Sequence, residues 1–456
     1  MIMLRKNPCS SKLTKNKKMN RFSKNSAITF FSRALVSLLS FLILMILART
    51  LGPEKIGIYT LIILFPQMAF RLGNLGIGVA NIYHIGSKRY KLDEVISNSI
   101  IFTFISSLVL ILIIFGVLQT DSVNGFLNTN GIDKTYLWLV TLTFPFSLLT
   151  EAILSIFLGK EDIVKYNRIN IFRKILQLAL VVLLLIILKQ GLLGAVVAYS
   201  MTGLVVVAVV LMMIRKLSRI KLIYNIGLFK NSIAYGIKAY LGNIAQFLNY
   251  RLDMFLVAVF LSPVEVGYYG IAVVIVENIW MLPGAIATVL LPRIASIKTE
   301  EANSLTPRVA SHTFFITIII SVFVALFANI FIKIFFGTNF LAAVLPLLIL
   351  LPGVIVFSVT KTLSADLAGR GKPQLNAYVS FISLAINIPL NILFIPKWGI
   401  SGAALASSIA YSVATVVTIM IYTRVSKRSW KNILIMKRTD LKLYSDFINS
   451  VFRKKI

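Results

Sequence analysis

Polar side chains recur at helical spacing inside two long apolar runs near the N-terminus. Arg33 shares a helical face with nearby serines in the first run, and Gln67, Arg71 and Asn74 share a face in the next. If these runs cross a membrane, charged residues within them usually face the interior of a helix bundle or a water-filled cavity, because hydrocarbon solvates charge poorly. The pattern therefore predicts a polar surface inside a bundle. The alternative is that Arg33 and Arg71 snorkel to the cytoplasmic interface.

A second set of polar residues lies in the middle of the chain. Asn243, Gln246 and Asp253 fall on one helical face, and Arg251 lies on roughly the opposite face. Glu277 lies near the middle of the following apolar run. These residues again indicate an interior polar surface. The structural alternative is that Arg251 and Asp253 pair with neighbouring helices.

A longer stripe of amides and hydroxyls runs along residues 374–395. Such stripes often form hydrogen bonds between neighbouring helices, and we favour that interpretation here over a binding surface. The stripe consists of Asn376, Ser380, Ser383, Asn387 and Asn391.

The sequence lacks the residue patterns of several enzyme classes. It contains no G-x-x-x-x-G-K-[ST] motif, so no P-loop for nucleotide hydrolysis is predicted. Cys9 is the only cysteine, and the two histidines, His84 and His312, lack the sequence partners of a metal site. We therefore predict no catalytic residue, no bound metal and no cofactor.

Composition identifies the class of protein. Hydrophobic residues make up 58% of the 456 residues and charged residues 14%, whereas a soluble domain carries about 25% charged residues. The formal net charge is +31, but the cations lie in the gaps between apolar runs. That placement is typical of a membrane protein and argues against nucleic acid as a partner. We predict an all-α polytopic membrane protein whose basic termini meet anionic lipid head groups.

About a dozen runs reach the length of about 20 residues that a membrane-spanning helix needs. Of the 47 Lys and Arg residues, 38 lie on the side of the N-terminus and six on the other side. By the positive-inside rule, both termini are predicted to be cytoplasmic. The twelve predicted spans are 26–49, 56–80, 95–118, 135–158, 168–188, 192–214, 236–261, 265–291, 309–332, 340–368, 374–395 and 399–423.

The two halves of the chain resemble each other. Residues 51–59 (LGPEKIGIY) recur as residues 261–269 (LSPVEVGYY), at an offset of 210. Residues 191–195 (GLLGA) recur as residues 399–403 (GISGA), at an offset of 208. A repeat of six spans returns the chain to its starting side, so we expect two parallel six-helix lobes around a central cavity.

The repeat also aligns two residues of opposite charge. Glu151 in the fourth span corresponds to Lys361 in the tenth, again at an offset of 210. We predict that they form an inter-lobe ion pair that holds one conformation closed. The predicted domains are a basic cytoplasmic arm (1–25), a first six-helix lobe (26–214), a basic cytoplasmic linker (215–235), a second six-helix lobe (236–423) and a basic cytoplasmic tail (424–456).

Over most of its length the chain resembles the polysaccharide repeat-unit flippases of O-antigen, capsule and exopolysaccharide synthesis. These are relatives of the lipid II flippases and the multidrug exporters. The resemblance is carried by residues 48–59 (ARTLGPEKIGIY), 72–77 (LGNLGI), 249–253 (NYRLD) and 266–269 (VGYY). The chain departs from the lipid II flippases in its twelve predicted spans, since those relatives carry fourteen helices.

The resemblance implies a transporter of the bacterial cytoplasmic (inner) membrane and not an enzyme. Its implied substrate is an oligosaccharide on undecaprenyl diphosphate, which alternating access of the two lobes turns from the cytoplasmic to the outer leaflet. The implied partners are this lipid, the membrane lipids and a polysaccharide polymerase that uses the delivered repeat unit.

The same resemblance implies roles for the polar faces. The arginines would hold the diphosphate through charge-assisted hydrogen bonds, and the amides would meet sugar hydroxyls. One buried carboxylate would carry a coupling proton or sodium ion. The implied substrate-binding residues are Arg33, Arg71, Arg251, Gln67, Asn74, Asn243 and Gln246, and the implied ion-coupling residues are Asp253 and Glu277.

Two other functions stay open at this point. A multidrug exporter of the same superfamily would favour acidic cavities for its cationic substrates, whereas the predicted cavity faces carry arginine. A membrane-embedded polysaccharide polymerase would be expected to carry a large outside loop. The longest predicted outside loop has about 16 residues, from 119 to 134.

Overall fold

Every element in the described part of the chain is helical. The computed structural model describes residues 8–217, 223 and 225–436, and it contains no strand within these ranges. Nine segments there are long and apolar enough to cross a membrane, judged by length and composition. The prediction of an all-α polytopic membrane protein is confirmed. The nine segments are Ile28–Gly73, Leu92–Leu118, Lys134–Gly159, Ile163–Ile187, Gly191–Arg215, Pro263–Ser296, Thr299–Phe335, Thr338–Gly369 and Gln374–Ser426.

Two of these segments bend at a glycine. Helix α1 (Pro8–Gly73) bends at Gly52, where φ is 75°, and α14 (Gln374–Ser426) bends at Gly399, where φ is 58°. Glycine adopts positive φ without the steric cost that other residues meet. Each bend lies in one of the repeated motifs. Each of these helices therefore covers two of the predicted spans.

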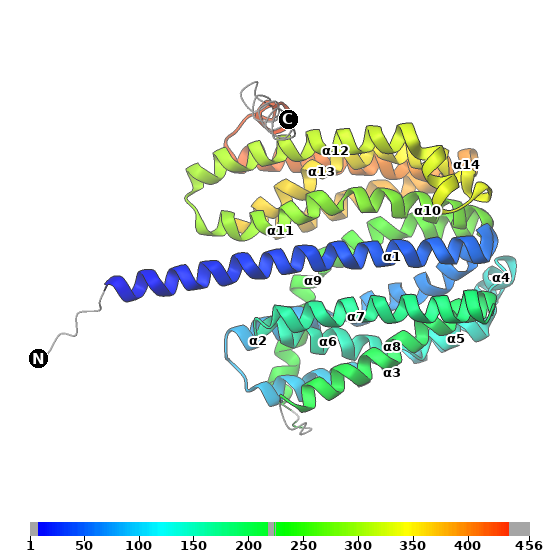
Figure 1. Ribbon diagram of the computed structural model, residues 1–456, viewed down its shortest axis with the longest axis horizontal. Helices are drawn as coiled ribbons and strands as arrows, with labels where there is room; N and C mark the ends of the chain where they lie inside the picture. The colour runs from blue at the N-terminus through cyan, green and yellow to red at the C-terminus, as the bar shows by residue number, and fades with distance from the viewer. Residues whose placement is uncertain (1–7, 218–222, 224, 437–456) are drawn as a thin grey trace, which may run out of the picture.

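The helices after α1 form a first packed group, and we call α1 to α8 the first lobe. Figure 1 shows α2 to α8 together on one side of the molecule. Short breaks interrupt two predicted spans, between α1 and α2 and between α5 and α6. The bounds are α2 (Ile77–Gly86), α3 (Leu92–Leu118), α4 (Asp121–Thr129), α5 (Lys134–Thr141), α6 (Phe144–Gly159), α7 (Ile163–Val181) with its π-helical continuation η1 (Val182–Ile187), and α8 (Gly191–Arg215).

The remaining helices form a second group, and we call α9 to α15 the second lobe. Figure 1 shows α10 to α14 packed together, with α1 and α9 between this group and the first. The bounds are α9 (Ile226–Phe260), α10 (Pro263–Ile279), α11 (Met281–Ser296), α12 (Thr299–Phe335), the 3-10 helix η2 (Thr338–Ala343), α13 (Val344–Gly369), α14 as given above and α15 (Lys431–Leu434).

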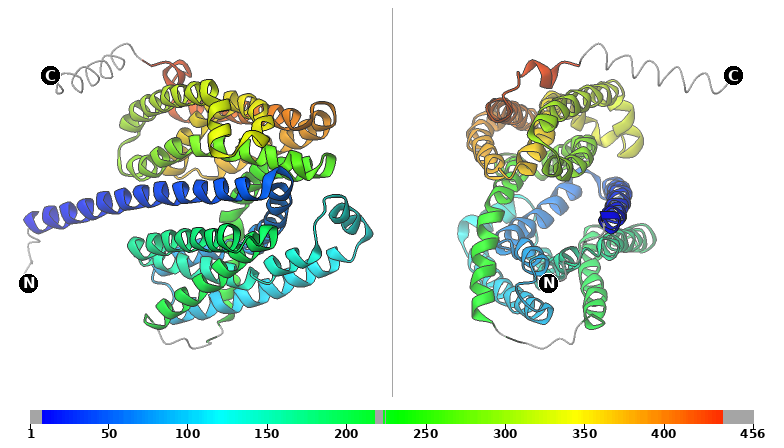
Figure 2. Two further views of the ribbon diagram at one scale, coloured as in Figure 1. Left: turned by 45° about the vertical axis from the view of Figure 1, so that its right-hand side comes forward. Right: turned by 90° about the vertical axis from the view of Figure 1, so that its left-hand side faces the viewer.

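Helix α9, which we count with the second lobe, also packs against the first lobe. Figure 2 shows it running along one side of the molecule from the first group to the second. In its first half, the Tyr235 ring stacks on the ring of Tyr83 in α2, with centroids 4.4 Å apart. In its second half, the Asn249 carbonyl accepts a hydrogen bond from Asn387 of α14 at 3.2 Å. The helix begins at Ile226, inside the stretch that the sequence indicated as a linker.

The two lobes meet through a reciprocal backbone contact beside the bend of α1. A Cβ atom on Gly57 would overlap the carbonyl oxygen of Pro263, and a Cβ atom on Gly267 would overlap the carbonyl oxygen of Pro53. At the offset of 210, Pro53 corresponds to Pro263 and Gly57 to Gly267. The contact therefore relates the two copies of one motif by an approximate two-fold axis. With the predicted orientation, it lies on the outer side of the membrane.

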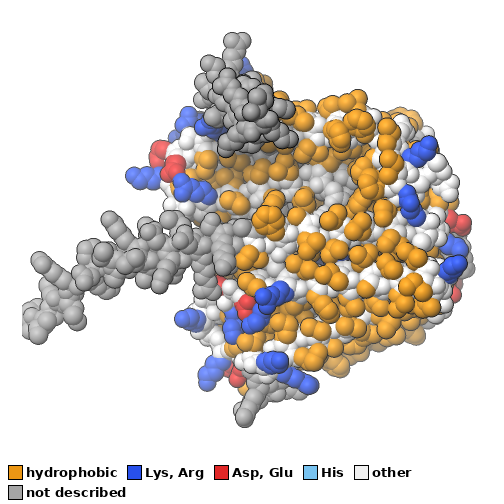
Figure 3. All heavy atoms as spheres, viewed as in Figure 1, with side chains coloured by type: hydrophobic (Ala, Val, Ile, Leu, Met, Phe, Trp, Pro, Cys, Tyr) orange, Lys and Arg blue, Asp and Glu red, His pale blue; other side chains and the backbone are white. Residues whose placement is uncertain are grey.

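The molecular surface has the distribution that a bilayer requires. Figure 3 shows hydrophobic side chains over the middle of the face in view, with Lys and Arg mostly toward its two ends. Large apolar side chains stand out from the bundle, including Leu326 and Phe104, which are 74% and 69% exposed. Such exposure suits a face in contact with lipid.

Candidate functional site

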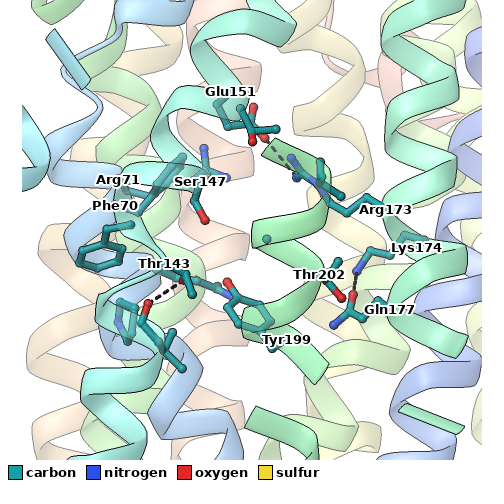
Figure 4. A pocket seen from close by; sticks show the side chains of 17 residues that line it. Phe70, Arg71, Thr143, Ser147, Glu151, Arg173, Lys174, Gln177, Tyr199 and Thr202 are labelled. Atoms are coloured by element: carbon teal, nitrogen blue, oxygen red, sulfur yellow. Dashed lines mark hydrogen bonds and ion pairs between the residues drawn. The ribbon is translucent and has the colours of Figure 1, made fainter. Parts of the chain in front are cut away.

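The first lobe contains a cavity with charged walls. It has a volume of about 290 Å³ and opens among α1, α5, α6, α7 and α8. Figure 4 shows its polar side chains converging from these helices. The polar residues that line it are Gln67, Arg71, Thr143, Ser147, Thr150, Glu151, Arg173, Lys174, Gln177, Tyr199 and Thr202.

The break between α5 and α6 helps to form this cavity. Thr143 lies in the break, and its hydroxyl donates to the carbonyl oxygen of Val140 at 2.6 Å. Pro145 follows in the first turn of α6, where its missing N–H costs no helical hydrogen bond. The chain thus restarts as a second helix that carries Ser147, Thr150 and Glu151 along the cavity wall.

Cations outnumber carboxylates on the cavity wall. Arg71, Arg173 and Lys174 carry three positive charges, and Glu151 carries the single negative charge among the lining residues. Glu151 pairs with Arg173 at 3.3 Å, and Lys174 donates to the side chain of Gln177 at 3.1 Å. The Glu151–Arg173 pair is partly exposed on both sides, so opening it costs little. The wall therefore has a net charge of +2 and an exchangeable ion pair.

Two of the predicted binding residues, Gln67 and Arg71, line this cavity. The Arg71 guanidinium lies 5.3 Å from the ring centroid of Phe247 in α9, which connects the cavity to the helix shared by the lobes. Arg33 is exposed on α1 and does not line this cavity.

The fourth predicted binding residue of this region, Asn74, occupies the break between α1 and α2. Its backbone N–H donates to the carbonyl oxygen of Phe70 at 2.9 Å, and its carbonyl oxygen accepts from Ile77 at 3.0 Å. Asn74 does not line the cavity. It joins the last turn of α1 to the first turn of α2 through its backbone.

In the second lobe, the predicted charged residues engage neighbouring helices. Arg251 of α9 pairs with Glu277 of α10 at 3.0 Å. Asp253 is buried and accepts hydrogen bonds from the Tyr269 hydroxyl at 2.6 Å and from the Ser407 hydroxyl at 3.1 Å. These contacts match the structural alternative for Arg251 and Asp253, and they link α9 to α10 and α14.

The predicted inter-lobe pair of Glu151 with Lys361 is absent from the ion pairs of the described residues. Glu151 instead has Arg173 within reach in its own lobe. The Lys361 ammonium lies 4.7 Å from the ring centroid of Trp280 and 5.5 Å from that of Tyr250, both in the second lobe. Aromatic faces attract a cation, so these rings stabilise the Lys361 ammonium. In this conformation Glu151 and Lys361 therefore each interact with partners in their own lobe.

The last two predicted binding residues, Asn243 and Gln246, lie apart from the charged cavity. Both are exposed side chains of α9 and line a second cavity, of about 470 Å³, within the second lobe. The predicted set of seven binding residues is therefore divided among at least two sites.

Sequence reasoning missed the α7 side of the charged cavity. Arg173 and Lys174 were counted as cytoplasmic cations at the start of a span, although they lie well inside α7 (Ile163–Val181). The spacing of Arg173 and Gln177, four residues apart, puts them on one helical face. The same spacing identified Gln67 and Arg71, so the signal was present in the sequence.

Comparison with known proteins finds relatives that match most of this chain. Residues 22–298 match the family described as polysaccharide biosynthesis protein. A probable low-salt glycan biosynthesis flippase of Haloferax volcanii is 25% identical over 390 residues, which cover 83% of this chain and 78% of that protein. A putative O-antigen transporter of Shigella flexneri is 23% identical over 430 residues, covering 88% of this chain and 97% of that protein.

Among solved structures, the lipid II flippase MurJ in an inward closed conformation has a similar fold. The TM-score is 0.74 at 19% identity, with 90% of this chain and 89% of that chain covered. The resemblance drawn from the motifs is confirmed, and the chain is a multi-pass membrane transporter of the flippase type, not an enzyme. The family match covers more than half of the sequence, so this chain belongs to the polysaccharide biosynthesis protein family.

Proposed function

We propose that this transporter is a flippase for undecaprenyl-diphosphate-linked oligosaccharides in a bacterial cytoplasmic membrane. It turns the head group from the cytoplasmic to the outer leaflet by alternating access, with both termini cytoplasmic, and delivers the repeat unit to a polysaccharide polymerase. The observation that carries the proposal is the first-lobe cavity, in which three cations face one carboxylate.

The head group needs such a cavity for a physical reason. A diphosphate with attached sugars loses its hydration if it crosses about 30 Å of hydrocarbon unaided. A polar cavity replaces the lost water with protein donors, while the polyprenyl chain stays in the lipid.

The cavity walls suit a diphosphate. Arg71 and Arg173 offer planar guanidinium groups that pair bidentately with phosphate, and Lys174 adds a point charge. Arg33 is a further exposed cation of α1, the helix that also carries Arg71. A cationic drug meets the same three positive charges as repulsion, which disfavours the multidrug-exporter alternative.

A reconstituted system tests the function directly. Purified protein in proteoliposomes is expected to accelerate the flipping of a fluorescent lipid-linked oligosaccharide well above protein-free vesicles. The same vesicles are expected to leave a fluorescent cationic drug where it was added. Transport of the drug without flipping of the lipid would replace this proposal with the exporter function.

Removal of the Glu151 carboxylate is expected to strengthen binding of the diphosphate lipid, whereas removal of a cation would weaken it. Glu151→Gln removes the carboxylate that competes with phosphate for Arg173, so the diphosphate lipid is expected to bind up to about tenfold more tightly. The affinity is measured with the purified protein in nanodiscs. Weaker binding by this variant would show that Glu151 orients Arg173 for the lipid instead of competing with it.

We also propose that Asp253 and Glu277 couple flipping to an ion gradient. The hydrogen bonds of Asp253 come from the neutral donors Tyr269, Ser407 and the Met254 backbone. Its carboxylate is therefore not held in an ion pair by any described residue and can take up a proton or a sodium ion. Glu277 holds Arg251, and proton uptake there would loosen α9 from α10. Both carboxylates lie where the lobe-bridging helix meets the second lobe.

The coupling assignment predicts the behaviour of a double variant. Asp253→Asn with Glu277→Gln is expected to flip lipid at a rate that no longer responds to an imposed proton or sodium gradient. Glu300→Gln, which changes an exposed carboxylate at the start of α12, is the matched control and is expected to keep the response. Gradient dependence that survives in the double variant would move the coupling site elsewhere.

A further inference from the structure

The second-lobe cavity differs in chemistry from the charged cavity. It has a volume of about 470 Å³ and lies among α9, α13 and α14. None of its fifteen lining residues, all within the described part of the chain, carries a charge. Five amide side chains and four serine or threonine hydroxyls line it. The amides are Asn243, Gln246, Asn249, Gln374 and Asn376.

One of these amides has an oxygen atom without a hydrogen-bond donor in the part of the chain that the structure describes. Asn376 donates its Nδ2 to the carbonyl oxygen of Ser364 at 2.9 Å, which ties α14 to α13. Its Oδ1 is buried and accepts no hydrogen bond from any described residue. A buried acceptor without a donor costs free energy. A ligand hydroxyl at this point would supply the missing donor.

The amide side chains of this cavity are not repeated at the corresponding positions of the first lobe. At the offset of 210, Gln246 corresponds to Val36 and Asn249 to Leu39 in the first lobe. At the offset of 208, Ser380 corresponds to Phe172. At the same two offsets, Asn243 corresponds to Arg33, Asn376 to Arg168 and Gln374 to Tyr166, so none of the five amides has an amide as its counterpart. The amide lining is therefore a property of the second lobe alone.

The lining selects a class of ligand. An ion finds no charge of opposite sign on these walls. An alkyl chain would leave the buried Oδ1 of Asn376 without a donor. A sugar carries hydroxyls that both donate and accept, as do the amides and hydroxyls of the wall. The ring of Phe357 adds an apolar surface, and the volume falls within the roughly 300–1,000 Å³ of small-molecule sites.

We propose that this cavity is a carbohydrate subsite that binds the oligosaccharide while the first-lobe cavity holds the diphosphate. This inference rests on the proposed function and assigns the two parts of the head group to different lobes. Asn243 and Gln246 are exposed on α9, the helix whose Phe247 ring also meets Arg71. Helix α9 therefore connects the sugar subsite to the charged cavity.

Two lipids test the assignment with the full chain in nanodiscs. One is the pool of lipid-linked oligosaccharides extracted from the native host, and the other is bare undecaprenyl diphosphate. The wild type is expected to bind the first about tenfold more tightly, because sugar hydrogen bonds add to the affinity. In Asn243→Ala with Gln246→Ala, the ratio of the two affinities is expected to fall to about one. Asn128→Ala, an exposed amide on α4, is expected to keep the wild-type ratio.

The outcomes separate this inference from the function on which it rests. If the double variant keeps the wild-type ratio, or if the wild type binds both lipids equally, the second-lobe cavity is not a carbohydrate subsite. If the wild type binds neither lipid, the proposed function itself fails and the subsite with it. Since both substituted side chains are exposed, a folding defect is not expected, and an unchanged elution profile in detergent checks this.

Discussion

Flipping of a lipid-linked oligosaccharide is expected to slow about a hundredfold or more when Arg71 and Arg173 are both replaced by alanine. Each guanidinium offers charge-assisted hydrogen bonds to the diphosphate, and the loss of one such interaction costs about 1.5–3 kcal/mol, or roughly tenfold to a hundredfold. Both side chains line the first-lobe cavity. Proteoliposomes that contain equal amounts of folded protein give the rate.

The matched control for this experiment lies on the same helix. Arg168 is an exposed arginine of α7 that does not line the cavity. Arg168→Ala is expected to flip lipid within about twofold of the wild type. If the double variant flips lipid at the same rate as Arg168→Ala and the wild type, Arg71 and Arg173 do not bind the diphosphate, and its site must be sought elsewhere.

A single methyl group on Gly57 is expected to separate the outer ends of the two lobes. In the closed contact a Cβ atom there would overlap the carbonyl oxygen of Pro263. This oxygen belongs to the backbone, so it cannot move aside by a side-chain rotation. Forcing an extra methyl into a packed interface costs about 1–3 kcal/mol, enough to move the conformational equilibrium about tenfold. Gly57→Ala therefore favours the outward-open state and slows flipping.

Electron spin resonance distances measure this shift. Spin labels are attached at Asn128→Cys in α4 and Leu341→Cys in η2, with Cys9→Ser to remove the native thiol. Both positions are exposed, and in the predicted orientation they lie at the outer ends of their lobes. Gly57→Ala is expected to increase the population with long distances. Gly116→Ala, where a Cβ atom meets open space, serves as the control, and an unchanged distribution in Gly57→Ala would rule out this contact as the outer gate.

Hydropathy and the repeat were sufficient to predict the helical membrane fold. Long apolar runs have few stable forms in a bilayer, because only helices or closed barrels satisfy their backbone groups. The bends at Gly52 and Gly399 fall in the repeated motifs that the sequence revealed. The start of α9 was harder to predict, because residues 226–235 are too polar to read as a span, yet they pack against the first lobe.

The candidate site was predicted only in part. Gln67 and Arg71 were found by helical spacing, but Arg173 and Lys174 were assigned to the cytoplasm because they lie near the start of the predicted span 168–188. The ion partner of Glu151 was out of reach of sequence reasoning, since the pairing depends on the distance between α6 and α7. The repeat aligned Glu151 with Lys361, but equivalent positions in two lobes need not touch.

The reciprocal contact of Pro53 with Gly267 and of Pro263 with Gly57 has a consequence for how the two lobes pair. Such a pattern, in which each half offers the same patch to the other, is the isologous interface of a two-fold homodimer. Within one polypeptide, the two copies of the motif thus form the kind of self-complementary surface by which two identical subunits would pair. The interiors of the two lobes do not share this symmetry, since one holds a cationic cavity and the other a neutral one.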